Sequence, residues 1–184
     1  EGTRRLLAWA KSAGVKHVAF LSTVNVYAPV EGESVLFDES AAFVEPNGLN
    51  ATDYGLTKLE AERLVLDAAA DFGATVIFRP SMIYGVGMSG RSPLSYLERA
   101  LQTGEQITLS RPDGHYLTPV FVADVVDVLA RWLAASVSLT FNLGGPQSYT
   151  EGELARALAA HLMTPIAFID NPSPAMSLAI SSDK

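Results

Sequence analysis

The chain has 184 residues, of which 48% are hydrophobic and 18% are charged, a composition that suits one well-buried domain and excludes disorder throughout. Its net charge of -7 provides no electrostatic attraction to nucleic acid or to an anionic membrane, so neither is an expected partner. The absence of cysteine excludes disulfides, thiolate catalysis and cysteine-built zinc sites, and it fits a cytoplasmic location.

The first predicted elements are a helix and a buried strand. Helical spacing over residues 3–13 predicts a helix that Thr3 caps and whose core face includes Trp9. The apolar run at residues 17–23 predicts a strand covered on both faces, as in a parallel sheet. Residues 28–50 are rich in acids, proline and glycine and predict a long surface excursion.

A helix and a second buried strand come next. Residues 53–72 have the clearest helical pattern, and residues 74–78 form a short apolar run. A strand, a helix and a strand in this order predict a crossover between parallel strands. A further helix is predicted at residues 92–103, and two short strands are predicted within residues 106–122, around a turn at 112–114.

The last part of the chain continues the alternation. Asp124 is expected to open a helix that runs to about residue 134, and residues 139–143 form a strand. A capping box at residues 150–153 predicts a helix to about Met163, and residues 165–169 predict one more strand. We expect no clear finishing element after this strand.

This order predicts an α/β fold with a doubly wound, Rossmann-type parallel sheet and a small C-terminal substrate-binding portion. Residues 1–184 are expected to form a single-domain fragment whose first strands are missing. Residues 1–80 would supply the later part of the dinucleotide-binding sheet. Residues 81–184 would be mainly substrate-binding, with interleaved sheet elements.

Tyr54 and Lys58 are the candidate reactive pair. Residues four apart lie on one face of a helix, so the phenol and the ammonium are expected to project together. A nearby cation stabilises a phenolate and lowers the pKa of a tyrosine from its free value of ~10. The spacing alone is a weak signal, since an ordinary surface helix also carries such pairs.

The neighbouring strand ends strengthen this interpretation. Ser22 and Thr23 lie at the end of the first predicted strand, and the segment from Pro80 to Tyr84 follows the second. In open parallel sheets, ligands bind outside the carboxyl ends of the strands. The two strand ends and the start of the Tyr54 helix are therefore expected to converge on one edge.

Five motifs in this order resemble the extended short-chain dehydrogenase/reductase family, which includes the nucleotide-sugar epimerases and dehydratases. They cover almost the whole chain: a Ser/Thr segment ending in Val26-Tyr27, Tyr54-x-x-x-Lys58, Arg79-Pro80-x-x-x-Tyr84-Gly85, Pro119 to Val125, and Phe141 to Gly145. The resemblance implies an enzyme that uses NAD or NADP, acts on a small-molecule substrate such as a sugar nucleotide, and forms a homodimer.

The resemblance also implies residue roles at the reacting centre. Tyr54 would be the general acid/base, and Lys58 would lower its pKa and bind the nicotinamide ribose. Thr23 would hydrogen-bond the substrate oxygen that exchanges a proton with Tyr54. Ser22 is the competing candidate for this role and would also contact the cofactor.

The segment after the second strand would border both ligands. Pro80 and Ser81 would lie beside the nicotinamide, whereas Met82 and Tyr84 would approach the substrate.

Several departures from the family pattern leave alternatives open. Val24 and Asn25 replace the Asp-Glu pair of the dehydratases, which disfavours dehydration. No Arg follows the turn at residues 112–114, so a nucleotide-sugar substrate is less secure. The alternatives are an NAD(P)H-dependent ketone or aldehyde reductase, similar to hydroxysteroid or flavonol reductases, and a non-catalytic NAD(P)-sensing module. The family's Gly-rich phosphate-binding turn is absent, so we expect an N-terminal truncation and a chain that is inactive alone.

The glycine motif at residues 85–90 and His115 both have ordinary structural interpretations. Residues 85–90 match G-x-G-x-x-G, but they do not follow a strand directly and are read as a flexible substrate-side loop. His115 is read as an exposed turn histidine rather than as a substrate contact.

Overall fold

A parallel three-stranded sheet forms the centre of the protein, in a computed structural model that describes residues 1–31, 35–48, 51–88, 90 and 92–181. Its strand order is β1 (His17–Leu21), β4 (Ala74–Pro80) and β9 (Leu139–Leu143). Every residue of β4 is buried, because β4 pairs with a strand on each side and its two faces are covered. The predicted parallel arrangement of the first two strands is confirmed.

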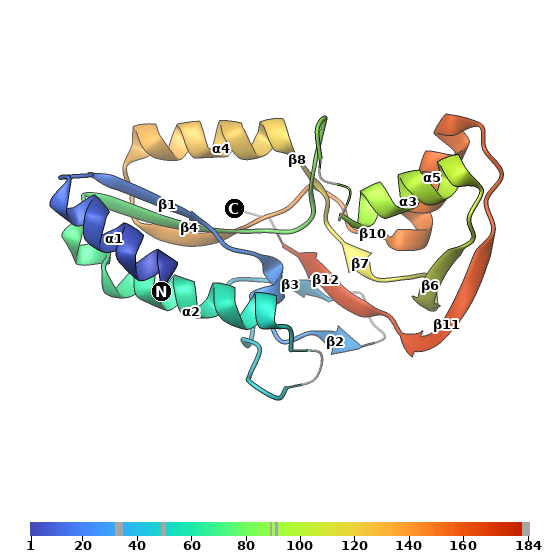
Figure 1. Cartoon of the computed structure of the whole chain (residues 1–184), viewed down its shortest axis with the longest axis horizontal. Coiled ribbons are helices and arrows are strands. Elements are labelled where there is room, and N and C mark those ends of the chain that lie inside the picture. Colours follow the sequence, from blue (N-terminus) through green and yellow to red (C-terminus); the bar gives the residue numbers. More distant parts are fainter. Residues whose placement is uncertain (32–34, 49–50, 89, 91, 182–184) are drawn as a thin grey trace.

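Helices cover both faces of this sheet (Figure 1). Helices α1 (Gly2–Ser12) and α2 (Asp53–Asp67) lie on one face, and α4 (Val122–Ala135) lies on the other. On the α4 side, the buried ring of Trp132 packs edge-on against Phe78. On the opposite side, Ile77 packs with Leu7 of α1 and Val65 of α2. The sheet is thus the middle of a three-layer sandwich.

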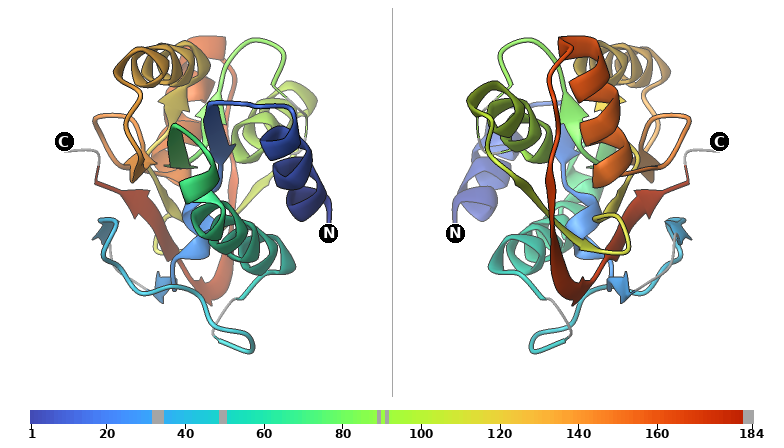
Figure 2. Two further views of the ribbon diagram at one scale, coloured as in Figure 1. Left: turned by 90° about the vertical axis from the view of Figure 1, so that its left-hand side faces the viewer. Right: turned by 90° about the vertical axis from the view of Figure 1, so that its right-hand side faces the viewer.

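A second layered unit follows in the chain. Helices α3 (Pro93–Thr103) and α5 (Glu151–Leu162) pack side by side, as Figure 2 shows, against the parallel pair β6 (Ile107–Arg111) and β11 (Phe168–Pro174). The capping box predicted at the start of α5 is present, since Thr150 and Glu153 hydrogen-bond reciprocally.

A five-stranded sheet joins the two units. Its order is β10 (Tyr149–Thr150), β7 (Tyr116–Leu117), β12 (Met176–Ile180) and β2 (Val30–Glu31), and β3 (Leu36–Phe37) also pairs with β12. The remaining short elements are β5 (Ile83–Tyr84), its partner β8 (Val120–Phe121), and the 3₁₀ helices η1 (Val24–Val26) and η2 (Ala69–Asp71).

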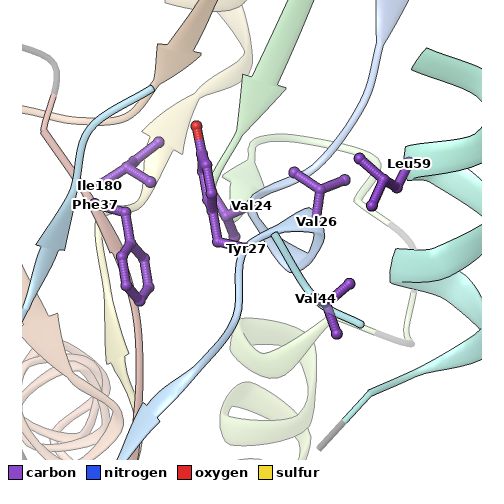
Figure 3. Packing of buried hydrophobic residues seen from close by; sticks show 7 residues of the cluster. All are labelled: Val24, Val26, Tyr27, Phe37, Val44, Leu59 and Ile180. Atoms are coloured by element: carbon purple, nitrogen blue, oxygen red, sulfur yellow. The ribbon is translucent and has the colours of Figure 1, made fainter. Parts of the chain in front are cut away.

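A hydrophobic cluster sits where these parts meet. Figure 3 shows the ring of Tyr27 beside Phe37 and Ile180, with Leu59 contributed by α2. These residues come from η1's C-terminal flank, β3, β12 and α2, so the cluster fixes η1 against both the helix and the joining sheet.

Two predictions about the first elements are wrong. The strand β1 is not covered on both faces, because His17, Ala19 and Leu21 are exposed. The strands β4 and β9 supply buried side chains beneath α4, whereas β1 contributes the exposed ring of His17, which packs edge-on against Trp132. Trp9 is 61% exposed, so it is not a core residue of α1.

Three predictions about element ends are also corrected. The N-cap of α1 is Glu1 rather than Thr3, which lies inside the helix. Helix α4 begins at Val122, so Asp124 lies in its first turn and does not cap it. The chain does have a late element, β12, which was not predicted because its sequence signal is weak and its strand partners lie far away in the sequence.

Candidate active site

Tyr54 and Lys58 lie on the same side of α2. The N-cap residue Thr52 accepts a hydrogen bond from the backbone of Gly55 at 3.0 Å, which fixes the start of the helix. The ammonium of Lys58 is 5.9 Å from the ring centroid of Tyr54 and donates to the carbonyl oxygen of Leu21 at 2.7 Å. The pair therefore lies at the carboxyl end of β1.

The two side chains differ in their solvent exposure. Tyr54 is 54% exposed, so its phenol is accessible to a ligand. Burial lowers the pKa of the Lys58 ammonium, while the carboxylate of Glu62, one helical turn further along, opposes that shift. A partly desolvated cation acts more strongly on neighbouring groups than one in bulk water.

Thr23 is held next to the start of α2 by a close backbone contact. A Cβ atom on Gly55 would lie 2.2 Å from the carbonyl oxygen of Asn25, so only glycine permits this approach. The hydroxyl oxygen of Thr23 accepts a hydrogen bond from the backbone nitrogen of Asn25 at 3.3 Å. Thr23 itself is 7% exposed. The contact thus ties the residue after the strand to the Tyr54 helix.

Ser22 is buried beneath this contact. Its backbone nitrogen donates to the carbonyl oxygen of Phe78 at 2.7 Å, which extends the pairing of β1 with β4. Its hydroxyl is buried and has no hydrogen-bond partner among the residues that the structure describes. Such a group is rare in folded proteins and calls for an explanation.

Pro80 and Ser81 lie at the carboxyl end of β4, where the prediction puts the nicotinamide. Both are buried. The hydroxyl of Ser81 accepts from the backbone nitrogen of Thr118 at 3.2 Å and donates to the carbonyl oxygen of Leu178 at 3.4 Å. Ser81 therefore ties β4 to the joining sheet, and its hydroxyl is engaged within the protein.

Met82 and Tyr84 line a cavity away from the Tyr54–Lys58 pair. That cavity has a volume of about 680 Å³ and extends toward α3 and α5, and Thr23, Tyr54 and Lys58 do not line it. The ring of Tyr84 packs against Phe121, with centroids 5.5 Å apart. The substrate roles expected of Met82 and Tyr84 stay predictions.

A buried polar network behind the site was not predicted. The guanidinium of Arg79 on β4 forms a salt bridge to Glu62 of α2 at 2.7 Å and donates to the hydroxyl of Tyr27 at 3.0 Å. Tyr27 in turn donates to the side chain of Asn142 on β9 at 2.6 Å. Burial raises the pKa of Tyr27, although its hydrogen bond with Arg79 opposes this, so the phenol stays a donor.

The sequence contains one signal for this network. Glu62 is a carboxylate on the face of α2 that packs against the sheet, and Arg79 is the one charged residue in the buried strand β4. Buried charges need a partner of opposite sign, so these two could have been paired. The network connects α2, β4 and β9 directly behind Lys58.

The Gly-rich segment after β5 is not placed like a phosphate-binding turn. A Cβ on Gly85 would lie 2.5 Å from the side chain of Val122, so this glycine packs on the start of α4. The following helix α3 begins only at Pro93. Residue 89, in the middle of the motif, lies outside the described residues.

The model of the NAD dependent epimerase/dehydratase family matches residues 1–144. This chain belongs to that family. The family predicted from the five motifs is confirmed, and its description agrees with the predicted nicotinamide cofactor.

Curated relatives include enzymes of nucleotide-sugar metabolism. UDP-glucuronic acid decarboxylase 3 of Arabidopsis thaliana is 29% identical over 164 residues, which cover 85% of this chain and 46% of the relative. UDP-glucose 4-epimerase of Vibrio cholerae is 27% identical and matches 89% of this chain and 49% of its own length. The chain thus spans about half the length of these relatives.

Solved structures confirm the Rossmann-type α/β fold. MoeE5 in complex with UDP-glucuronic acid and NAD has a TM-score of 0.76 and 26% identity, with 95% of this chain and 60% of MoeE5 covered. UDP-glucose 4-epimerase of Thermus thermophilus, in complex with NAD, has a TM-score of 0.80 at 19% identity, covering 98% and 60% of the two chains. Within the described ranges, no helix has the length and apolar character needed to cross a membrane.

Proposed function

We propose that the whole protein uses NAD to oxidise and reduce a carbinol carbon of a nucleotide-linked sugar, with Tyr54 as the general acid/base. The relatives reported above favour this chemistry over a ketone reductase or a sensing module, because each is named for a reaction on such a sugar. The observation that carries the proposal is the placement of Tyr54 and Lys58 together at the carboxyl end of β1.

The residues present fit a nicotinamide nucleotide. Lys58 has three donor hydrogens and uses one on the carbonyl oxygen of Leu21, so it can also reach a ribose hydroxyl. Ser22 offers a buried hydroxyl without a partner in the described chain. Pro80 supplies an apolar wall at the neighbouring strand end. When bound, NAD would accept a hydride from the substrate carbon and return it.

The chain's own residues would manage the proton. Tyr54 would take the proton from the substrate hydroxyl as the carbon is oxidised and give it back on reduction. Thr23 would donate a hydrogen bond to the same oxygen, since its own oxygen is oriented by the backbone nitrogen of Asn25. Among the described residues, the hydroxyl proton of Thr23 has one acceptor, the side-chain oxygen of Asn25. At 3.5 Å this contact is long, so a substrate oxygen can replace it.

Replacing Tyr54 by Phe tests this role. We expect Tyr54→Phe in the whole protein to lower kcat by at least ~100-fold, because general acid/base catalysis typically contributes ~10²–10⁴. NAD binding, measured by calorimetric titration, should persist, since the aromatic ring is retained.

Tyr96→Phe is the matched control, because Tyr96 lies on α3 and contacts the backbone of Thr108, away from the proposed centre. Turnover of UDP-glucose or UDP-glucuronic acid should be unaffected in this variant. If Tyr54→Phe keeps wild-type turnover, Tyr54 is not the acid/base.

A further inference from the structure

A smaller cavity adjoins the proposed catalytic residues. Its volume is about 230 Å³, and its lining includes Asn25, Tyr27, Thr52, His115, Met176 and Leu178. Asn25 is two residues from Thr23 and hydrogen-bonded to it, and Thr52 is two residues from Tyr54 and caps the same helix. The cavity is therefore next to the groups that would handle the substrate proton.

The polar groups in this cavity are neutral. Among the described residues that line it there is no Asp, Glu, Lys or Arg. The amide of Asn25, the hydroxyl of Thr52 and the imidazole of His115 provide hydrogen-bonding groups, while Met176 and Leu178 provide apolar surface. Such a lining suits a ring with several hydroxyl groups better than a phosphate.

The ring of His115 has a defined tautomer. Its Nδ1 accepts a hydrogen bond from the backbone nitrogen of Met176 at 2.9 Å. In the neutral imidazole the proton is therefore on Nε2. His115 lines the cavity, and its Nε2 has no hydrogen-bond partner among the residues that the structure describes, so this N–H is available to a ligand. His115 is half-buried and is not the exposed turn residue that the sequence suggested.

The backbone of His115 is fixed as well. Its nitrogen donates to the carboxylate of Glu151, at the start of α5, at 3.0 Å. Two residues earlier, Asp113 accepts hydrogen bonds from Thr150, the N-cap of α5, and from Arg156 within that helix. A donor held in advance loses little conformational entropy when it binds a ligand.

We propose that His115 is a specificity-determining residue, and that its Nε2–H donates a hydrogen bond to a hydroxyl of the sugar ring in this cavity. The inference rests on the proposed function, because it takes the sugar of a nucleotide-linked substrate as the occupant. The nucleotide part would lie outside the cavity and would not contact His115.

Two substitutions at His115 separate the Nε2–H donor from the hydrogen bond that Nδ1 accepts from Met176. In His115→Asn the side-chain oxygen can occupy the place of Nδ1 and accept from Met176, but the Nε2 donor is lost. In His115→Gln the amide nitrogen can occupy the place of Nε2 and donate. Both variants would be made in the whole protein on a Tyr54→Phe background, so that ligands bind without turnover.

The experiment is a calorimetric titration with NAD present, using UDP-glucose, UDP-glucuronic acid and UDP as ligands. We expect His115→Asn to weaken both sugar nucleotides about tenfold, equivalent to ~1.4 kcal/mol, and to leave UDP unchanged. His115→Gln should recover most of the loss in affinity. Because it removes the bond from Met176 to Nδ1, which His115→Asn can replace, it should melt at a lower temperature than His115→Asn.

Other outcomes overturn the inference. Unchanged affinity for the sugar nucleotides, an equal loss for UDP, or no binding of either sugar nucleotide to the Tyr54→Phe parent would each exclude His115 as a sugar contact. These results are distinct from a failure of the proposed function, which is decided by the turnover of Tyr54→Phe with His115 intact.

Discussion

The carboxylate of Asp113 shows how a single residue sets the geometry of the turn before β7. It accepts hydrogen bonds from the hydroxyl of Thr150 at 2.6 Å and from Arg156 at 3.1 Å. Burial alone would raise the pKa of Asp113, but the hydrogen bonds from Arg156 and Thr150 hold it below its ordinary value of 3.8. The turn that presents His115 is thereby attached to α5.

The lowered pKa of Asp113 predicts a stability effect that depends on pH. A carboxyl whose pKa is lower in the folded state stabilises the fold above its unfolded pKa, and this contribution is lost as the pH falls through the folded value. Arg156→Gln should therefore lower the free energy of unfolding by ~1 kcal/mol or less near neutral pH, since solvent screens the pair. The difference from wild type should shrink below pH ~4.

Urea unfolding at several pH values measures this difference. Arg131→Gln is the control, because Arg131 forms an exposed pair with Asp127 at 3.9 Å and should matter little. A difference for Arg156→Gln that does not change with pH would show that it does not act through the charge of Asp113.

At the scale of elements, the contact between η1 and α2 sets the distance between Thr23 and Tyr54. The backbone of Asn25 in η1 packs directly on Gly55, the third residue of α2. Any side chain at Gly55 would separate the two elements. The glycine in Tyr54-Gly55 is therefore required by tertiary packing and not by helix formation, for which alanine is better.

We expect Gly55→Ala to be harmful for this reason. The added Cβ would lie 2.2 Å from the carbonyl oxygen of Asn25, so α2 must shift. The expected cost is ~1–3 kcal/mol in the free energy of unfolding, and kcat of the whole protein should fall by up to ~100-fold because the reacting groups are displaced.

Gly2→Ala is the matched control, because a Cβ there meets no atom within 4 Å. It should be neutral or slightly stabilising in the same urea unfolding experiment. Wild-type stability and turnover in Gly55→Ala would contradict the close approach of the two elements.

At the scale of the whole molecule, β12 joins the segments around the candidate active site, which include β7, β3 and η1. It pairs with β7, β2 and β3, and its residue Ile180 is 1% exposed in the cluster around Tyr27 (Figure 3). The backbone nitrogen of Ile180 also donates a hydrogen bond to the hydroxyl oxygen of Thr118 at 3.2 Å. Packing at β12 therefore stabilises η1 and the surroundings of the smaller cavity.

Truncating Ile180 should destabilise the protein strongly. Ile180→Ala removes buried aliphatic carbon atoms and leaves a cavity, which typically costs ~2–5 kcal/mol in the free energy of unfolding. Ile169→Ala is the control, because Ile169 on β11 is 44% exposed. Its cost in urea unfolding should be clearly smaller, and equal losses at both positions would contradict the central role of β12.

The sequence by itself determined the family, the alternation of the main helices and strands along the chain, and the alignment of Tyr54 with Lys58 on one helix face. These properties depend on local patterns, since residues four apart share a helix face in any context. Capping at Thr150 and the burial of β4 were also readable, because both depend on short segments.

Only the tertiary structure decided which distant residues meet. The bond from Met176 to His115 joins residues 61 positions apart, and the bond from Tyr27 to Asn142 spans 115 positions. No local pattern encodes such a pairing, because it depends on how the joining sheet packs between the two units. For the same reason, β12, the exposure of β1 and the free donor of His115 became visible only in three dimensions.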